Sequence, residues 1–143
     1  MLNCTGYVTM VGDLFHYGHV RFLKQAKSRC DHLLVGIHTD DVVQTYKQKP
    51  TMSMEERIEV VRAWKYVDDV LADAPLITTP ELLDKLNIDI VFIAISPTPN
   101  YTINDQYPNV TDKLLTLDYT TTISTTDIIQ RITSQNQPQK QRS

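Results

Sequence analysis

Two runs of the sequence are apolar without a break, LLVGI at residues 33–37 and IVFIAI at residues 90–95. A strand of this kind is buried on both faces, which happens mainly in parallel sheets that helices cover on both sides. Shorter runs rich in strand-forming residues lie at 7–11, 67–71 and 114–117. The sequence therefore predicts a parallel sheet of five strands.

Segments with helical character separate these strands. The clearest signal is a capping box, in which Ser53 can accept from the free N–H groups of a helix and Glu56 can reach back; this helix should run to about Trp64. Other helices are expected at 20–27, after a cap at Asp40, from Pro80 to Leu86, and from about Thr126 with Ile128, Ile129 and Ile132 inside. Strands that alternate with helices predict an α/β fold, a Rossmann-like doubly wound sheet with helices on both faces.

The chain is expected to form one domain at residues 1–133, because no internal repeat or linker divides it. Residues 134–143 (SQNQPQKQRS) offer no apolar surface to bury and are expected to be a disordered polar tail. The segment 96–109 contains three prolines and should be a surface loop rather than an element.

Composition excludes several classes of function. No apolar run approaches the roughly 20 residues that cross a bilayer, so membrane insertion is not expected. The N-terminus shows no secretory pattern, which favours a cytoplasmic protein. Cys4 and Cys30 form neither a disulfide framework nor a Cys-x-x-Cys site. A net charge of −3 argues against a nucleic-acid partner, so local groups must hold any phosphate ligand.

His16 and His19 flank Gly18 where the first predicted strand turns into the first predicted helix. Ligands of doubly wound sheets bind there, beyond the carboxyl ends of the strands and near the reversal of strand order. Gly18 lets the backbone approach a ligand, and the N–H groups of a helix start favour an anion. The imidazoles add hydrogen-bond donors and, if protonated, positive charge. Fixed donors at this point would stabilise the charge that develops in attack on an α-phosphate.

The sequence by itself leaves several interpretations of this loop open. A single histidine near a helix start is commonly a surface or capping residue. A zinc site is disfavoured because no cysteine or further histidine at suitable spacing completes the ligand set. Asp13 could cap the helix, orient a histidine or serve only as a turn residue.

The stretch DLFHYGH at residues 13–19 resembles the His-x-Gly-His nucleotidyltransferase superfamily, and its cytidylyltransferase branch in particular. The resemblance extends over roughly residues 7–133. Its segments look like those of ethanolamine-phosphate and choline-phosphate cytidylyltransferases: VGIHTD at 35–40, YK at 46–47, MEER at 54–57, YVDDV at 66–70 and ISTTD at 123–127.

The resemblance implies roles for individual residues. Catalytic roles fall to His16, His19 and Lys47. The nucleotide would contact Val11, Gly12, Asp13, His16, Gly18, His19, Ile123, Ser124, Thr125 and Thr126. The phosphate substrate would contact His38, Lys47, Lys49 and Arg57. Without the resemblance, the lysines are ordinary loop charges, Arg57 could equally pair with a carboxylate, His38 could be structural, and the hydroxyl residues could be a plain N-cap.

The implied reaction is transfer of CMP from CTP to a small phosphorylated alcohol, ethanolamine phosphate first, with release of pyrophosphate. The resemblance also implies Mg²⁺ as counter-charge without a metal site of the protein's own, a homodimer, and a role in making phospholipid or phosphonate precursors. Met10 and the YTTT stretch at 119–122 resemble instead the branch that activates 2-aminoethylphosphonate, and ISP at 95–97 replaces a usual Gly-Asp. Glycerol 3-phosphate could also be the acceptor, ATP could be the donor, or the chain could be a catalytically degenerate nucleotide-binding relative.

Overall fold

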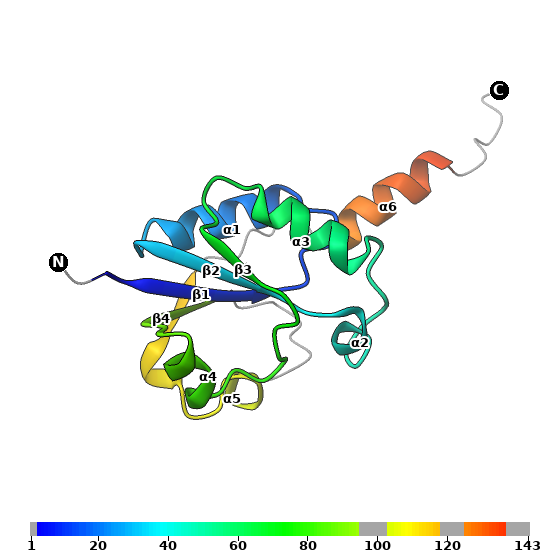
Figure 1. Cartoon of the computed structure of the whole chain (residues 1–143). Coiled ribbons are helices and arrows are strands. Elements are labelled where there is room, and N and C mark those ends of the chain that lie inside the picture. Colours follow the sequence, from blue (N-terminus) through cyan, green and yellow to red (C-terminus); the bar gives the residue numbers. More distant parts are fainter. Residues whose placement is uncertain (1–2, 95–102, 118–124, 137–143) are drawn as a thin grey trace, which may run out of the picture.

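A computed structural model describes residues 3–94, 103–117 and 125–136, and these contain one parallel five-stranded sheet (Figure 1). Its strands are β1 (Thr5–Met10), β2 (His32–Ile37), β3 (Asp69–Leu71), β4 (Ile90–Ala94) and β5 (Leu114–Leu117). The strand order is β3-β2-β1-β4-β5, so the chain first moves outward from β1 and then returns to β1's other side. The predicted doubly wound fold and its five strands are confirmed.

Helices cover both faces of the sheet. Figure 1 shows α1 (Tyr17–Lys27) and α3 (Met54–Arg62) on one face, and α4 (Pro80–Lys85) and α5 (Ile103–Gln106) on the other. The short helix α2 (Asp40–Val43) follows β2, and a 3₁₀ turn, η1 (Thr111–Lys113), precedes β5. None of the described helices is long and apolar enough to span a membrane.

The helix starts agree closely with the sequence signals. Ser53 accepts from the N–H of Glu56, whose carboxylate accepts from the N–H of Ser53, so the predicted capping box is confirmed. Pro80 begins α4 as predicted. The cap of α2 differs from the prediction: the hydroxyl of Thr39 accepts from the N–H of Val42, and Asp40 is the first helical residue. Threonine and aspartate are both good caps, and the backbone turns helical one residue earlier than a cap at Asp40 would require.

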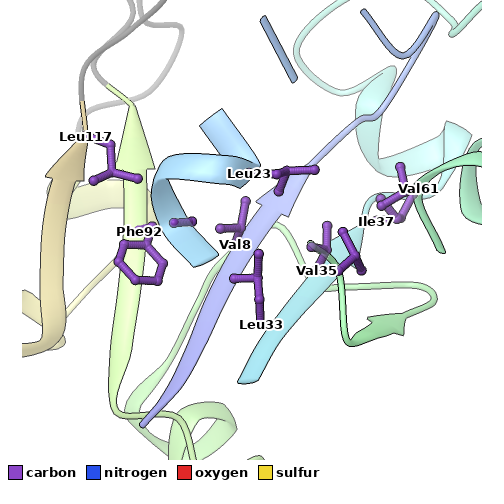
Figure 2. Packing of buried hydrophobic residues seen from close by; sticks show 10 residues of the cluster. Val8, Leu23, Leu33, Val35, Ile37, Val61, Phe92 and Leu117 are labelled. Atoms are coloured by element: carbon purple, nitrogen blue, oxygen red, sulfur yellow. The ribbon is translucent and has the colours of Figure 1, made fainter. Parts of the chain in front are cut away.

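The central strands supply two cores because successive side chains of a strand point to opposite faces. Val8, Leu33 and Val35 pack beneath α1 and α3, in the cluster that Figure 2 shows. The alternate residues Tyr7 and Leu34 belong to a second cluster with residues of α4 and of the segment after α5. This burial on both sides explains why the sequence of β2 is apolar without a break.

Part of the segment expected to be a surface loop forms a helix and contributes to a core. Residues 103–106 form α5, and Tyr107 and Val110 belong to the second core. Tyr107 lies within the predicted loop and Val110 directly after it, so buried side chains anchor a segment whose proline and asparagine content predicted only a loop. Residues 95–102, which also carry part of that prediction, lie outside the described residues.

Helix α6 (Thr125–Asn136) begins one residue before the predicted start but lacks the predicted interior. None of its residues is buried, and Ile129 and Ile132 are 43% and 50% exposed. Figure 1 shows α6 extending away from the sheet. Apolar spacing predicts a helix but cannot say which surface covers it. Residues 134–136 are helical rather than disordered, and residues 137–143 of the predicted tail lie outside the described part of the chain.

Candidate functional site

The loop between β1 and α1, residues 11–16, lies where the sheet reverses its strand order, as predicted. Gly12 adopts a φ of 70°, and a Cβ there would lie 3.2 Å from Cγ2 of Val61 on α3. Leu14 also has a positive φ, 49°, and its N–H donates to Sδ of Met52. Left-handed backbone is costly for leucine and is retained where surrounding contacts determine it. The loop is therefore a tight turn held against α3.

His16 and His19 cap the helix that they begin. Nδ1 of His16 accepts from the N–H of Gly18 at 3.0 Å, and Nδ1 of His19 accepts from the N–H of His16 at 3.1 Å. A neutral imidazole whose Nδ1 accepts must carry its proton on Nε2. The structure thus assigns both rings the same tautomer, with an Nε2–H left to donate.

Burial keeps these rings neutral. It lowers the pKa of His16, against a weaker opposing effect of Asp127. It also lowers the pKa of His19 to about 3, and the nearby His16 and Lys47 act in the same direction. The loop therefore carries two neutral imidazole donors near pH 7, and not the pair of positive charges that the sequence also allowed.

An aromatic stack fixes the orientation of His19. The rings of His16 and His19 lie 4.0 Å apart between centroids, and Phe15 stacks on His19 at 5.4 Å with an interplanar angle of 14°. Trp64, just after α3, contacts Phe15 in turn at 6.2 Å. Phe15 was not among the predicted site residues, although its place beside His16 in the motif is a signal that could have found it.

The first residue of α6 is attached to the histidine loop. The hydroxyl of Thr125 donates to the carbonyl oxygen of Asp13 at 3.2 Å, because a carbonyl can only accept. The oxygen of Thr125 lies 3.3 Å from Nε2 of His16, which must then be the donor in that contact. This contact agrees with the tautomer derived above. The structure thus brings Thr125 to the site; Thr126 is exposed, and Ile123 and Ser124 lie outside the described residues.

Asp13 joins the histidine loop to the segment that carries the lysines. Its two carboxylate oxygens accept from the N–H groups of Thr51 and Met52, each at 2.9 Å. The predicted option of a helix cap is wrong, because His16 itself is the cap. The described hydrogen bonds of the Asp13 carboxylate go to backbone N–H groups rather than to a histidine. Both carboxylate oxygens of Asp13 are thus already engaged by the protein.

Arg57 lies behind the site rather than in its opening. Its side chain is fully buried and donates to the carbonyl oxygens of Val11 at 2.7 Å, His38 at 2.8 Å and Met52 at 3.3 Å. It also forms an ion pair with Asp40 at 2.7 Å. Of the two roles that the sequence left open, phosphate binding and carboxylate pairing, the structure shows the second. Arg57 connects the ends of β1 and β2 with the residues before α3.

Lys47 lies within electrostatic reach of two histidines. Its positive charge lowers the pKa of His19 and the pKa of His38, although burial is the larger cause for each. Partial burial of its ammonium lowers the pKa of Lys47 itself, with Asp13 opposing and Arg57 adding to the effect. Lys49, like Lys47, is an exposed residue of the same segment.

The described residues contain no group of three His, Cys, Asp or Glu side chains that could hold a metal ion. The chemical resources of the site are therefore neutral imidazole donors and the ammonium of Lys47. Together these groups can bind and orient phosphates.

The sequence of the chain is similar to those of known proteins. A family model described as cytidylyltransferase-like matches residues 13–131. The chain is 38% identical over 122 residues to the ethanolamine-phosphate cytidylyltransferase of Mus musculus, covering 84% of this chain and 30% of that protein. It is 40% identical over 132 residues to choline-phosphate cytidylyltransferase 2 of Arabidopsis thaliana, covering 88% and 43%. The chain thus spans less than half the length of either relative.

Solved structures support the fold. The crystal structure of the lipopolysaccharide core biosynthesis protein from Thermoplasma volcanium GSS1 aligns with a TM-score of 0.66 at 17% identity, covering 82% of this chain and 97% of that one. Pantoate-beta-alanine ligase from Francisella tularensis aligns with a TM-score of 0.56 at 17% identity, covering 89% and 68%. At this level of identity, the likeness concerns the fold alone.

Proposed function

Because the chain belongs to the cytidylyltransferase-like family, as its sequence resemblance predicted, we propose that it is an enzyme that transfers CMP from CTP to a small phosphorylated alcohol. Ethanolamine phosphate is the proposed acceptor, since two relatives at 38% and 35% identity are ethanolamine-phosphate cytidylyltransferases. An oxygen of the acceptor's phosphate attacks the α-phosphorus of CTP and forms a new P–O bond. The bond from the α-phosphorus to the oxygen that bridges to the β-phosphorus breaks, and pyrophosphate leaves with that electron pair.

The fixed tautomer of His16 and His19 is the observation that carries the proposal. Each ring uses Nδ1 to hold the helix start and carries its proton on Nε2. The Nε2–H of His16 donates to Thr125 at 3.3 Å in this structure, and in the proposed reaction it would exchange that contact for a phosphate oxygen of CTP. In phosphoryl transfer, negative charge develops on the oxygens around the reacting phosphorus and on the leaving group. Donors that are already oriented stabilise that charge without reorganising during the reaction, and such groups can account for a large share of catalysis.

Lys47 and the start of α6 complete the proposed site. The ammonium of Lys47 lies near His19 and His38 and would hold the acceptor's phosphate against the α-phosphate of CTP. Thr125, in contact with His16, places the start of α6 beside the same loop, where the positive end of the helix dipole would favour phosphate oxygens. Catalysis in this proposal is positional and electrostatic, with no covalent intermediate on the enzyme.

Mg²⁺ is also part of the proposal. The described side chains do not form a cage for it. Such a site suits Mg²⁺, which commonly binds through substrate phosphates and keeps several of its waters. The ion would add positive charge along the triphosphate, while His16, His19 and Lys47 bind the same phosphates from the protein side.

A homodimer in the cytoplasm completes the proposal. Ile129 and Ile132 of α6 form an exposed apolar surface that a second copy of the chain could cover. The free thiols of Cys4 and Cys30 suit a reducing compartment.

A product assay tests the reaction. With CTP, Mg²⁺ and ethanolamine phosphate, we expect pyrophosphate and an equal amount of CDP-ethanolamine by ³¹P NMR. Lys47→Ala should weaken the binding of both CTP and ethanolamine phosphate. Lys49→Ala is the matched control and should weaken their binding less. Hydrolysis of CTP without a joined product, or no reaction with ethanolamine phosphate, choline phosphate, glycerol 3-phosphate and 2-aminoethylphosphonate, would contradict the proposal. A faster reaction with ATP than with CTP would show that ATP is the nucleotide donor.

A further inference from the structure

His38 presents the opposite hydrogen-bonding character to His16 and His19. It follows β2, is 1% exposed, and places Nδ1 3.1 Å from the carbonyl oxygen of Ala74. Because a carbonyl can only accept, Nδ1 of His38 must carry a proton. Burial lowers the pKa of His38, so Nε2 is unprotonated near neutral pH. Its Nε2 is therefore a hydrogen-bond acceptor.

The position of His38 is fixed from several directions. Its N–H donates to the carbonyl oxygen of Met10, which keeps it beside the end of β1. Its own carbonyl oxygen accepts from the buried guanidinium of Arg57 at 2.8 Å. Ala74, which holds the ring, is anchored in turn by an N–H bond to Ile37. The backbone of His38 is thus held by Met10 and Arg57, and its ring is held by the turn after β3. The ring therefore cannot easily flip to exchange Nδ1 and Nε2.

Lys47 relates His38 to the proposed substrate. Its charge acts on both His19 and His38, so its ammonium lies near the histidine loop as well as near the end of β2. In the proposed reaction Lys47 holds the acceptor's phosphate, while the histidine loop holds CTP. The histidine loop follows β1 and His38 follows the neighbouring strand β2, where its N–H donates to the carbonyl oxygen of Met10. His38 therefore lies at the same edge of the sheet as the histidine loop.

We propose that His38 is a specificity-determining residue, which selects phosphorylated alcohols whose far end donates a hydrogen bond. This inference rests on the proposed function and deepens it. A primary ammonium or a hydroxyl can donate to Nε2, whereas a trimethylammonium group has no N–H. A substrate without a donor would displace water from Nε2 without replacing its hydrogen bond, and sites built to bond a donor discriminate strongly against analogues that lack it.

A methylation series tests the proposal without changing the protein. Ethanolamine phosphate and its N-methyl and N,N-dimethyl forms all keep at least one N–H, and choline phosphate keeps none. We expect kcat/KM to change little over the first two methyl groups and to fall by about tenfold to a hundredfold at the third, the effect of one hydrogen bond to a charged group. An even decline with each methyl group would indicate selection by size and overturn the proposal, as would a preference for choline phosphate.

Two variants of His38 sharpen the test. His38→Asn keeps an N–H near the position of Nδ1 for Ala74 but removes the far acceptor, whereas His38→Gln places an amide near the position of Nε2. We expect His38→Asn to raise KM for ethanolamine phosphate and to leave KM for CTP nearly unchanged. In this variant kcat/KM should no longer fall between the N,N-dimethyl substrate and choline phosphate. In His38→Gln part of that fall in kcat/KM should return. An unchanged methylation profile in both variants would overturn the proposal.

The same assays separate this inference from the proposed function. If no acceptor reacts with CTP, the proposed function fails, and the role of His38 fails with it. If all four acceptors react with an even trend, the proposed function stands and only the role of His38 is wrong. Glycerol 3-phosphate is the last acceptor to test, because its far end carries hydroxyl groups. If its KM rises in His38→Asn as expected for ethanolamine phosphate, the group that donates to His38 is a hydroxyl rather than an ammonium.

Discussion

Helices α3 and α6 both begin at the candidate site, but only α3 is built into the fold. α3 buries Arg57 and Val61, and the guanidinium of Arg57 bonds to backbone on three separate segments. α6 buries none of its residues and is attached to the histidine loop through Thr125. The comparison teaches that an amphipathic sequence predicts a helix, while side chains that reach other elements determine how firmly that helix is held.

The difference divides the site into two parts. The histidine loop and the residues before α3 form one network through Asp13 and Arg57, in which each segment is held by partly buried hydrogen bonds. The start of α6 joins this network at its edge. We therefore expect changes in α3 and the histidine loop to have large effects, and changes along α6 to have small ones.

The largest effect on stability should come from Arg57→Ala. The change leaves three backbone carbonyls and Asp40 without their partner, and we expect the free energy of unfolding to fall by about 3 kcal/mol or more. Urea denaturation measures the loss. Arg62→Ala, at the exposed end of the same helix, is the control and should change stability by no more than about 0.5 kcal/mol. Similar small losses in both variants would show that Arg57 does not hold the network.

His16→Ala and His19→Ala should lower turnover by about a hundredfold or more, the scale of losing one oriented donor to the transition state. The fold should survive, since both side chains are only partly buried. Steady-state kinetics and circular dichroism separate the two effects. His32→Ala, exposed at the amino end of β2, is the matched control and should leave turnover unchanged. Unfolding of either site variant would assign that histidine a structural role.

Stability should fall as the pH is lowered below about 6.5, because the histidines have lowered pKa values in the folded protein. The pKa of His19 is about 3, so between about 6.5 and 3 the unfolded chain binds a proton there that the folded chain does not. Each such proton makes stability fall by up to about 1.4 kcal/mol per pH unit. The lowered pKa values of His16 and His38 act in the same direction.

Urea denaturation between pH 7 and 4.5 measures this dependence before most carboxylates titrate. His19→Gln should reduce the slope, since glutamine does not titrate. A free energy of unfolding that stays constant over this range would contradict the assigned burial of the histidines.

The parts of the fold that the sequence predicted depend on local patterns. Uninterrupted apolar runs identified β2 and β4, and the capping box at Ser53 identified α3. The partners of Arg57 and Asp13 could not be predicted, because their bonds join segments far apart in the chain. Burial of Tyr107 was missed for the same reason. Motif resemblance identified the histidine loop, but only the hydrogen-bond geometry assigned its tautomers.

The smallest effect should come from α6. At concentrations where the chain is monomeric, we expect Ile132→Ala to change the free energy of unfolding by no more than about 0.5 kcal/mol, because the side chain is exposed. Val61→Ala, in the core beneath α3, should cost about 1 to 3 kcal/mol. Thermal denaturation at several protein concentrations makes the comparison. Equal costs in the monomer would mean that α6 packs against the body of its own chain.

The central claim is that the histidine loop and the start of α6 form a site for CTP, and calorimetric titration in Mg²⁺ tests it most directly. We predict that CTP binds more tightly than ATP, and that His16→Ala weakens both nucleotides by a similar factor, because His16 donates to phosphates that both share. Equal affinities or a preference for ATP would contradict the assignment of CTP. Binding of neither nucleotide would show that the chain is a degenerate relative and contradict the claim as a whole.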